Sequence, residues 1–293
     1  MTDGILIIDK PTDWTSHDVV GKLRRILKTK RIGHTGTLDP FATGVLVMLV
    51  GQATRLAQFL DKDVKEYEAV VRLGFETDTG DLTGSPKSQV SSLKSITPES
   101  LKDALAAFRG EILQTPPMYS AKKVDGKKLY ELARKGVEIE RKPVAVTIYE
   151  LEIKDQRPKT KDQIEIRVLC TAGTYIRTLA QDIGRKIGTG AHLTALRRTR
   201  AGKFDLAKAL TIKQLEEVVS SGKLNDYLIS MNEAASHLPE ISLNEEEVKK
   251  IRNGMKLPSN LNAESVRLTD SENNLIAIGT AHENFVRPKI VFV

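Results

Sequence analysis

The sequence predicts an α+β protein with a small second unit at its C-terminal end. Strand-like and helix-like segments follow one another without the regular strand–helix–strand order of a doubly wound parallel sheet. Residues 65–73 alternate between apolar and polar side chains, which indicates a strand with one buried face. The composition changes near Leu238-Pro239, and the chain beyond it has the size of a small β-barrel.

The first sixty residues predict a strand, an amphipathic helix and a glycine-rich loop. Residues 5–8 are apolar and form a short strand candidate. Ser16 is the candidate N-cap of a helix whose apolar residues recur every 3.6 positions, with basic residues on its other faces. The glycine-rich segment 33–44 leads into an apolar strand at 45–50, and a short helix is expected near 53–60.

The middle and end of the chain predict further helices and strands. Residues 85–96 are rich in serine and lysine and predict a loop. Thr97 can cap the next helix, because Pro98 is tolerated at a first helical position, and Gly110 would follow its end. The remaining expected elements are helices at 129–135, 174–187, 211–221, 226–235 and 244–253, and strands at 144–154, 163–171, 193–204, 264–269, 274–281 and 286–293.

Length and composition are those of an ordinary globular protein with one large and one small domain. The chain has 293 residues. Its apolar runs stay far below the ~18 residues that span a bilayer, and its first residues do not predict a secretory signal. Cys170 is the single cysteine, so no intramolecular disulfide can form. We therefore expect a cytoplasmic location.

The net charge of +7 is concentrated in the middle of the chain. Residues 167–208 contain nine Lys or Arg and two acidic residues, and residues 115–145 contain eight Lys or Arg and four acidic residues. From residue 238 onward, seven basic residues face eight acidic ones. Such clusters attract phosphate backbones, although a solvated basic surface explains them as well.

The segment from Gly33 to Gly44 contains a single charged side chain, that of Asp39. Asp39 precedes Pro40, and an Asp-Pro pair commonly opens a turn, so a structural role is one interpretation. The segment lacks the Gly-Lys-Ser/Thr of a phosphate-binding loop and the Gly-x-Ser-x-Gly of a nucleophile elbow. A carboxylate held in a glycine-rich loop is the other interpretation, a reactive group.

Other candidate residues also allow two interpretations. Tyr67 lies on the apolar face of its strand and could be a core residue, and Arg177 could lie on a helix surface. The turn 78–81 could hold a metal ion, but a plain turn explains it equally well. The histidines other than His34 lack metal-ligand spacing; they are His17, His192, His237 and His282.

The segment around Asp39 resembles the catalytic loop of the TruB-type tRNA pseudouridine synthases. The match runs from Lys30-Arg31-Ile32 through Gly44-Val45-Leu46. Residues 3–235 share further motifs with that family; these are Lys10-Pro11, Lys65–Ala69, Pro116–Lys122, Gly173–Arg177 and Leu193–Arg200. The C-terminal segment resembles, less closely, a PUA-like RNA-binding domain.

The resemblance implies roles for particular residues of this chain. Asp39 would be the catalytic aspartate, Tyr67 the tyrosine stacked on the target base, and Arg177 the arginine paired with the aspartate. His34 would hold the T loop open after the uridine flips out, and Tyr175 would lie near the reacting base. The other implied supporting or RNA-contacting residues are Lys10, Leu196, Lys122, Lys123, Arg197 and Arg198.

The resemblance also implies a fold and a reaction. The fold would be a mixed, largely antiparallel sheet with helices at 1–237, carrying a basic RNA-binding insertion at about 115–145, and a PUA-like domain at 238–293. The reaction would convert uridine 55 in the T loop of tRNA into pseudouridine, without cofactor, metal or obligate protein partner, in a monomer. Asp39 could attack C1′, stabilise positive charge on the sugar, or take the C2′ proton.

A protein that only binds RNA, or that helps tRNA to fold, would use the same basic surface. Such a binder needs the cations but has no use for the conjunction of Asp39, Tyr67 and Arg177. A nucleotide enzyme is disfavoured, because no phosphate-loop lysine follows the glycines.

Overall fold

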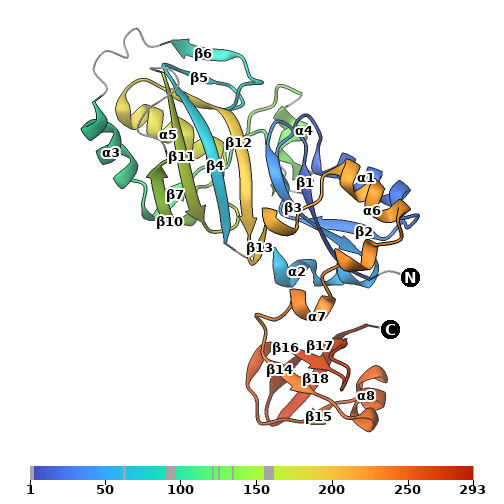
Figure 1. Cartoon of the computed structure of the whole chain (residues 1–293). Helices are drawn as coiled ribbons and strands as arrows, with labels where there is room; N and C mark the ends of the chain where they lie inside the picture. The colour runs from blue at the N-terminus through green and yellow to red at the C-terminus, as the bar shows by residue number, and fades with distance from the viewer. Residues whose placement is uncertain are drawn as a thin grey trace.

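The computed structural model describes residues 3–61, 64–89, 97–120, 122–124, 126–133, 135–154 and 162–292. Figure 1 shows a large sheet flanked by helices and a smaller β unit beside it at the C-terminal end of the chain. The expected α+β class is confirmed. In the described ranges, no helix is long and apolar enough to cross a membrane.

The large sheet contains nine described strands and is antiparallel except at one junction. Its order is β1-β3-β12-β4-β11-β10-β7, with β2 added to β3 and β13 to β12. The strands are β1 (Gly4–Lys10), β2 (Ile32–Thr35), β3 (Thr43–Val50), β4 (Lys65–Leu73), β7 (Gly110–Gln114), β10 (Val144–Ile153), β11 (Gln163–Cys170), β12 (Ala191–Ala201) and β13 (Phe204–Asp205). Two hairpins lie outside it; they are β5 (Phe75–Thr77) with β6 (Pro86–Gln89), and β8 (Lys123–Val124) with β9 (Lys127–Lys128).

The junction between β3 and β12 joins the two halves of the sheet. These strands run parallel and pair at Thr43 with Arg197 and at Gly44 with Arg198. On its other edge β12 pairs antiparallel along the whole of β4. The loop that carries Asp39 ends where β3 begins, so the junction brings that loop beside β4 and β12.

Gly44 makes the junction possible. Its φ is +100°, and a Cβ added there would lie 2.1 Å from the backbone oxygen of Arg198. We expect Gly44→Ala to lower the free energy of unfolding by more than about 3 kcal/mol, because it combines backbone strain with a clash against backbone. Urea unfolding measures this loss. In the matched control, Gly21→Ala inside α1 (Ser16–Ile26), a Cβ meets no atom within 4 Å, so that change should stabilise the protein by up to about 1 kcal/mol.

Helices cover each half of the sheet with a separate hydrophobic core. The helices are α1, α2 (Ala57–Leu60), α3 (Pro98–Ala106), α4 (Leu129–Ala133), α5 (Ile176–Ile187), α6 (Ile212–Ser220) and α7 (Met231–Ala234), with 3-10 turns at Gly51–Leu56, Leu206–Lys208 and Leu224–Asp226. On the β4 side, α3 and α5 pack through Leu101, Leu105 and Leu179 against the sheet. On the β1 side, α1 and α6 pack through residues such as Leu23 and Leu215. Both cores are rigid supports for the loops between them.

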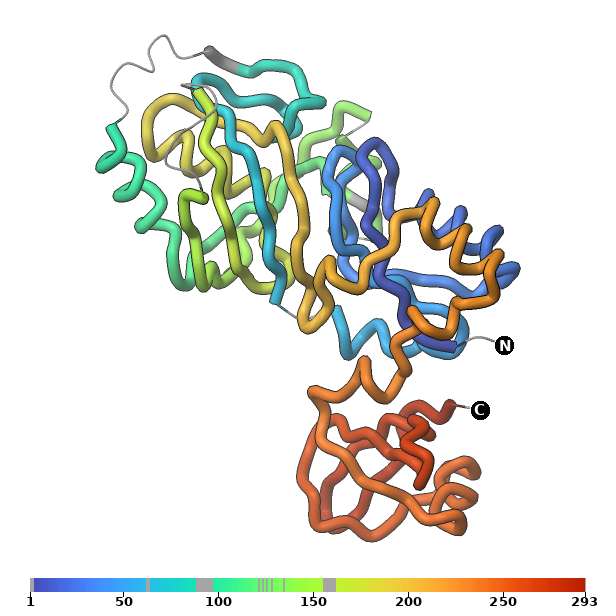
Figure 2. The backbone as a smooth tube through the Cα atoms, in the orientation of Figure 1, coloured from blue at the N-terminus to red at the C-terminus, as the bar shows by residue number. Residues whose placement is uncertain are grey.

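The C-terminal unit has its own core and an apolar contact with the large sheet. Its elements are β14 (Glu240–Ser242), α8 (Glu245–Arg252), β15 (Leu257–Pro258), β16 (Ala263–Thr269), β17 (Leu275–His282) and β18 (Phe285–Val291), in the sheet order β14-β16-β17-β18-β15. In Figure 2 the chain enters this unit directly after α7. Ile278 and Phe292 belong to the same hydrophobic cluster as Ile5 and Leu56, so the two units are packed together.

Several predicted boundaries differ from the structure. Thr15, rather than Ser16, caps α1, because Thr15 and Asp18 form a capping box. Residues Pro86–Gln89 form a strand where a loop was expected, since they pair with β5; residues 90–96 lie outside the described residues. The helix predicted to reach about residue 109 ends at Ala106, and α5 begins at Ile176 rather than residue 174.

Candidate active site

A cavity of about 270 Å³ lies where β4, β12, the Asp39 loop and the start of α5 meet. Asp39, Tyr67 and Arg177 all line it, although 138 residues separate the first from the last. The other lining residues include Gly36, Leu38, Lys65, Ser120, Tyr175, Leu196 and Arg198. The predicted catalytic residues are therefore brought together at one place.

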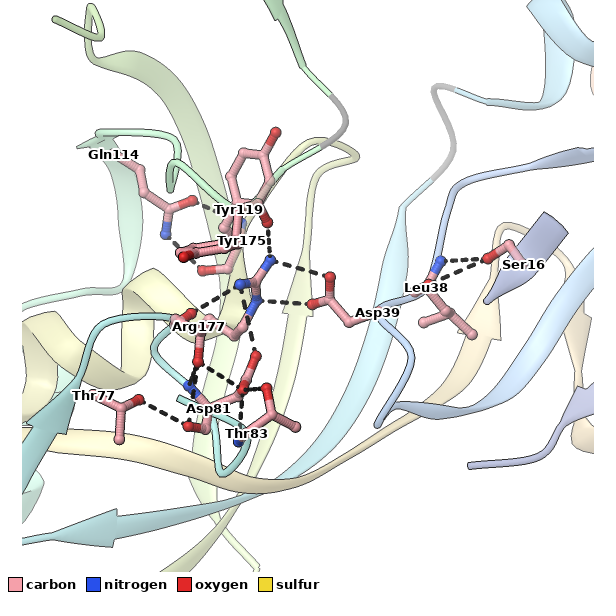
Figure 3. A network of polar contacts seen from close by, with 11 residues as sticks. Ser16, Leu38, Asp39, Thr77, Asp81, Thr83, Gln114, Tyr119, Tyr175 and Arg177 are labelled. Carbon is pink, nitrogen blue, oxygen red and sulfur yellow. Dashed lines mark hydrogen bonds and ion pairs between the residues drawn. The ribbon is translucent and has the colours of Figure 1, made fainter. Parts of the chain in front are cut away.

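Ser16 fixes the backbone of the loop directly before Asp39. The buried Ser16 hydroxyl accepts a hydrogen bond from the Leu38 N–H at 2.9 Å and donates to the Leu38 carbonyl at 3.3 Å (Figure 3). Ser16 was expected to cap its helix, but Thr15 takes that role and leaves the Ser16 hydroxyl free for the loop. The first turn of α1 is thereby attached to the loop that carries Asp39.

Lys10 fixes the loop directly after Asp39. Its ammonium group donates to the carbonyls of Pro11, Trp14 and Pro40 at 2.8, 2.6 and 3.0 Å. The side chain is fully buried, and burial lowers its pKa to about 8. Lys10 thus supports the loop, as the resemblance implies for the Lys10-Pro11 motif, and all three donors of its ammonium group are used by the backbone.

Arg198 supports the loop from β12. Its guanidinium group donates to the carbonyl of Val45 at 2.7 Å and to that of Gly36 at 2.8 Å. Arg198 is buried and lines the cavity, and its predicted place beside RNA stays a prediction. Three side chains from three elements thus anchor the backbone on both sides of Asp39.

Arg177 forms a two-point ion pair with Asp39. Arg177 Nε lies 2.8 Å from Asp39 Oδ2, and Nη2 lies 3.1 Å from Oδ1 (Figure 3). The arginine side chain is 5% exposed and that of the aspartate 33% exposed, so the carboxylate faces the cavity while the guanidinium group lies behind it. Such a planar pair fixes the orientation of the carboxylate as well as its charge.

The backbone and a second carboxylate hold the other side of the guanidinium group. Arg177 Nη1 donates to the Thr79 carbonyl at 2.8 Å, and Nη2 donates to the Tyr119 carbonyl at 2.6 Å. Asp81 Oδ2 lies 3.7 Å from Nη1, while Asp81 Oδ1 accepts from the backbone and hydroxyl of Thr83. The segment 78–81 is thus a turn that presents Asp81 to the arginine.

Burial raises the pKa of the Asp39 carboxyl above its usual value. The guanidinium group of Arg177 opposes this shift, the nearby Asp81 carboxylate adds to it, and Lys10 opposes it more weakly. A carboxylate that is partly removed from water but paired with a cation stays reactive toward developing positive charge.

Aromatic and apolar side chains form the walls of the cavity. Tyr67 projects from β4 and is buried; this burial raises the pKa of its phenol, which therefore stays protonated near neutral pH. Tyr175 precedes α5, and Leu196 projects from β12. The hydroxyl of Ser120 also lines the cavity and has no hydrogen-bond partner among the described residues. The aromatic and apolar side chains offer faces for a planar base, and the charged and hydroxyl groups of the same lining offer polar contacts.

His34 lies on β2 beside a neighbouring hollow. That hollow is lined by residues of the loop and of α2, and it shares Gly36, Thr37 and Asp61 with the cavity that Asp39 lines. Burial lowers the pKa of His34, and the positive charge of Arg198 adds to this shift. His34 is thus a neutral ring next to the cavity mouth.

The predicted basic residues are divided between surfaces. Lys122 precedes the hairpin formed by β8 and β9, and the side chain of Lys123 lies outside what the structure describes. Arg197 points away from Arg198 along β12; its guanidinium group pairs with Asp9 at 2.7 Å and contacts Thr43. The structure therefore places Arg197 beside β1 rather than in the cavity.

Three contributors to the site were missed by sequence reasoning. Asp81 was noted only as part of a turn, Ser16 only as a helix cap, and Gln114 not at all. Gln114 makes two hydrogen bonds with the backbone of Tyr175, at 3.0 and 2.7 Å. All three act across 22 to 96 residues of chain, so no local pattern signals them.

Family models match nearly the whole chain. Residues 24–176 match the TruB family pseudouridylate synthase N-terminal domain, residues 177–236 the tRNA pseudouridylate synthase B C-terminal domain, and residues 239–292 the pseudouridine synthase II TruB C-terminal model. The chain is 43% identical over 295 residues to the tRNA pseudouridine synthase B of Solibacter usitatus, with 99% of each chain covered. It is 44% identical over 285 residues to that of Bacillus cytotoxicus, covering 96% of this chain and 93% of the relative.

Solved structures show the same fold. A chain from a Cbf5–Nop10–Gar1 complex superposes with a TM-score of 0.77 at 26% identity, covering 99% of this chain and 85% of that one. A chain from an H/ACA ribonucleoprotein bound to a substrate RNA containing 2′-deoxyuridine superposes with a TM-score of 0.75 at 25% identity, with the same coverage.

Proposed function

The chain belongs to the TruB family of pseudouridine synthases, and we propose that it converts a uridine of tRNA into pseudouridine at position 55 of the T loop. Its curated relatives are tRNA pseudouridine synthases along nearly their whole length. The observation that carries the proposal for this chain is the Asp39 carboxylate, which Arg177 holds at the floor of a cavity with aromatic walls.

The chemistry requires a carboxylate in this position. As the bond between N1 of the base and C1′ of the sugar breaks, positive charge develops at C1′. We propose that Asp39 meets this charge, either by bonding to C1′ or by removing the C2′ proton. The base then turns, and its C5 bonds to C1′ as the bond from Asp39 to C1′ breaks or the C2′ proton returns. C5 loses its proton and N1 takes one up, so the product is an isomer of uridine and the balance needs no redox equivalent and no cosubstrate.

The cavity walls suit a flipped base. A base inside the T loop is stacked, and its C1′ is out of reach, so the nucleotide must leave the stack. We propose that Tyr67 stacks on the extruded uracil, with Tyr175 and Leu196 closing the other sides. The neutral ring of His34, beside the cavity mouth, would occupy the gap that the uridine leaves in the T loop.

The basic surface would hold the RNA backbone. We propose that the insertion at about 115–145, with Lys122 and Lys123, closes on the T arm, and that Arg197 lies near the RNA on the β1 side. We assign residues 1–237 to catalysis and residues 238–293 to a PUA-like domain that adds a modest anchor, since its charge is near neutral. A cytoplasmic location fits a tRNA substrate and a single cysteine that is buried.

A T-arm stem-loop with 5-fluorouridine at the target position tests the proposed function. We expect a slowly resolved covalent adduct with the wild-type protein, because fluorine at C5 cannot leave as a proton does. The same RNA with uridine should instead be converted and released. Reversible binding without adduct or conversion would favour a protein that only binds or folds RNA.

A further inference from the structure

Gln114 is the last residue of β7, and its side chain is fully buried. Its amide makes two hydrogen bonds with the backbone of a single residue. Nε2 donates to the Tyr175 carbonyl at 3.0 Å, and Oε1 accepts from the Tyr175 N–H at 2.7 Å (Figure 3). The glutamine side chain thus pairs with Tyr175 in the way that a neighbouring strand would.

The pairing falls at the start of the catalytic helix. Tyr175 is the N-cap residue of α5, and Arg177 is the second residue of that helix. Tyr175 makes no capping hydrogen bond with its own side chain, whereas Thr15, Thr97 and Thr211 cap their helices in this way. Partly buried backbone N–H and carbonyl groups need partners. Gln114, from another strand, is the partner of the Tyr175 N–H, and it adds a second hydrogen bond to the Tyr175 carbonyl, which also accepts from the Leu179 N–H of α5 at 3.0 Å.

A second contact ties the same segment to the arginine itself. Tyr119, a few residues after Gln114, accepts a hydrogen bond from Arg177 Nη2 at 2.6 Å through its carbonyl oxygen. Figure 3 shows Gln114 and Tyr119 above Arg177 and Asp39 to its right. The chain from Gln114 to Tyr119 therefore holds both the first turn of α5 and the guanidinium group.

We propose that Gln114 is a positioning residue for the isomerisation: by clamping the backbone of Tyr175, it sets the Tyr175 ring against the uridine and the Arg177 guanidinium group against Asp39. The clamp matters because the ion pair has two short contacts, at 2.8 and 3.1 Å, and a small shift of the helix start breaks one of them. A displacement of 1 Å at a reacting group can cost about 10²-fold in rate. This inference rests on the proposed function.

The test replaces Gln114 by methionine, which has a similar length but neither donor nor acceptor. We expect kcat for tritium release from C5-labelled tRNA to fall by about 10- to 100-fold, with tRNA affinity unchanged. The matched control is Gln214→Met, which removes the capping hydrogen bonds of α6 with Thr211, far from the cavity. The control should lose some stability and keep its kcat.

Two further variants distinguish positioning from general stability. Gln114→Glu restores both hydrogen bonds whenever its carboxyl is protonated, so its kcat relative to wild type should recover, and more fully as the pH falls. In an Arg177→Lys background, Gln114→Met should add less than the full loss that it causes in the wild type, because the part of its effect that acts through the arginine is already gone and only the part that acts through Tyr175 remains. If Gln114→Met does not fold, the pH dependence of kcat for Gln114→Glu, relative to wild type, tests the positioning role by itself.

The outcomes separate this inference from the proposed function. A wild-type protein that releases no tritium contradicts the function itself. An active wild type whose folded Gln114→Met variant keeps full kcat overturns the positioning role alone. A Gln114→Glu variant whose relative kcat stays low at every pH overturns it as well.

Discussion

Replacing Asp39 by asparagine is expected to lower the rate of tritium release from C5-labelled tRNA by at least about 10⁴-fold, the upper end for a lost general base and less than for a lost nucleophile. Asparagine keeps the shape of the side chain but can neither attack C1′ nor take a proton from C2′. Its NH₂ group would also point at a donor of Arg177, where a carboxylate oxygen now accepts. Single-turnover assays with saturating enzyme measure the loss directly.

Asp39→Asn should bind tRNA with an affinity within about threefold of wild type. Asp39 acts on the transition state, and an interaction made only in the transition state does not contribute to the binding of unreacted tRNA. Asp39→Glu keeps the charge but moves the carboxylate along the chain, so it should also lose about 10²-fold or more. Asp205→Asn changes a carboxylate that caps a surface turn, and it should leave the rate unchanged. Full activity of Asp39→Asn would end the assignment of Asp39 as the catalytic residue.

Short-range patterns predicted most elements of the fold. The alternation at 65–73 identified β4 and its buried face, since Tyr67, Ala69 and Val71 all face the core. The glycine after α5 was a reliable end signal, because Gly188 takes the left-handed conformation that ends the helix. Such features depend on a few neighbouring residues, and those residues are visible in the sequence.

The strand order and the supports of the site could not be predicted in the same way. Nothing in the sequence near Thr43 indicates that β3 pairs with β12 in parallel across some 150 residues. The resemblance implies that Lys10 supports the loop and that Arg198 lies beside RNA, but it does not tell which atoms they bond; both are buried and bonded to loop carbonyls. Their roles depend on the tertiary packing, which places each cation beside a carbonyl that no strand satisfies.

The three proposed catalytic residues could be named from motifs, but only the structure brings them together. Asp39 comes from a loop, Tyr67 from β4 and Arg177 from α5. The parallel junction of β3 and β12 places the loop against the neighbouring half of the sheet. The loop lies between the end of β2 at Thr35 and the start of β3 at Thr43. Because no strand pairing among the described residues holds it there, three side chains anchor it instead.

Arg177→Met is expected to abolish most activity at neutral pH and to destabilise the protein. The arginine is the cation between two carboxylates, Asp39 and Asp81, and it also donates to the Thr79 and Tyr119 carbonyls. Removing one partner of a buried pair typically costs 3–5 kcal/mol. Because a third of the Asp39 side chain is exposed, we expect the lower end, about 3 kcal/mol, which corresponds to a fall in Tm of roughly 6–12 °C.

The pH dependence of the residual activity identifies the cause. Arg177 opposes the burial and the Asp81 charge that raise the pKa of Asp39, so its removal should raise that pKa further. The ionised carboxylate is the active form; activity is therefore lost as the pH falls through this pKa and returns above it. Measured between about pH 6 and 9, the rate of Arg177→Met relative to wild type should rise with pH.

Arg185→Met is the matched control for the loss of an arginine from α5. Arg185 lies on the same helix and pairs with Glu76 of β5 at 2.6 Å; the Arg185 side chain is 58% exposed and that of Glu76 14% exposed. A pair with one exposed partner contributes about 1 kcal/mol, so this variant should keep its kcat and most of its stability. A relative rate of Arg177→Met that does not change with pH would assign its defect to lost geometry at the cavity rather than to the charge of Asp39.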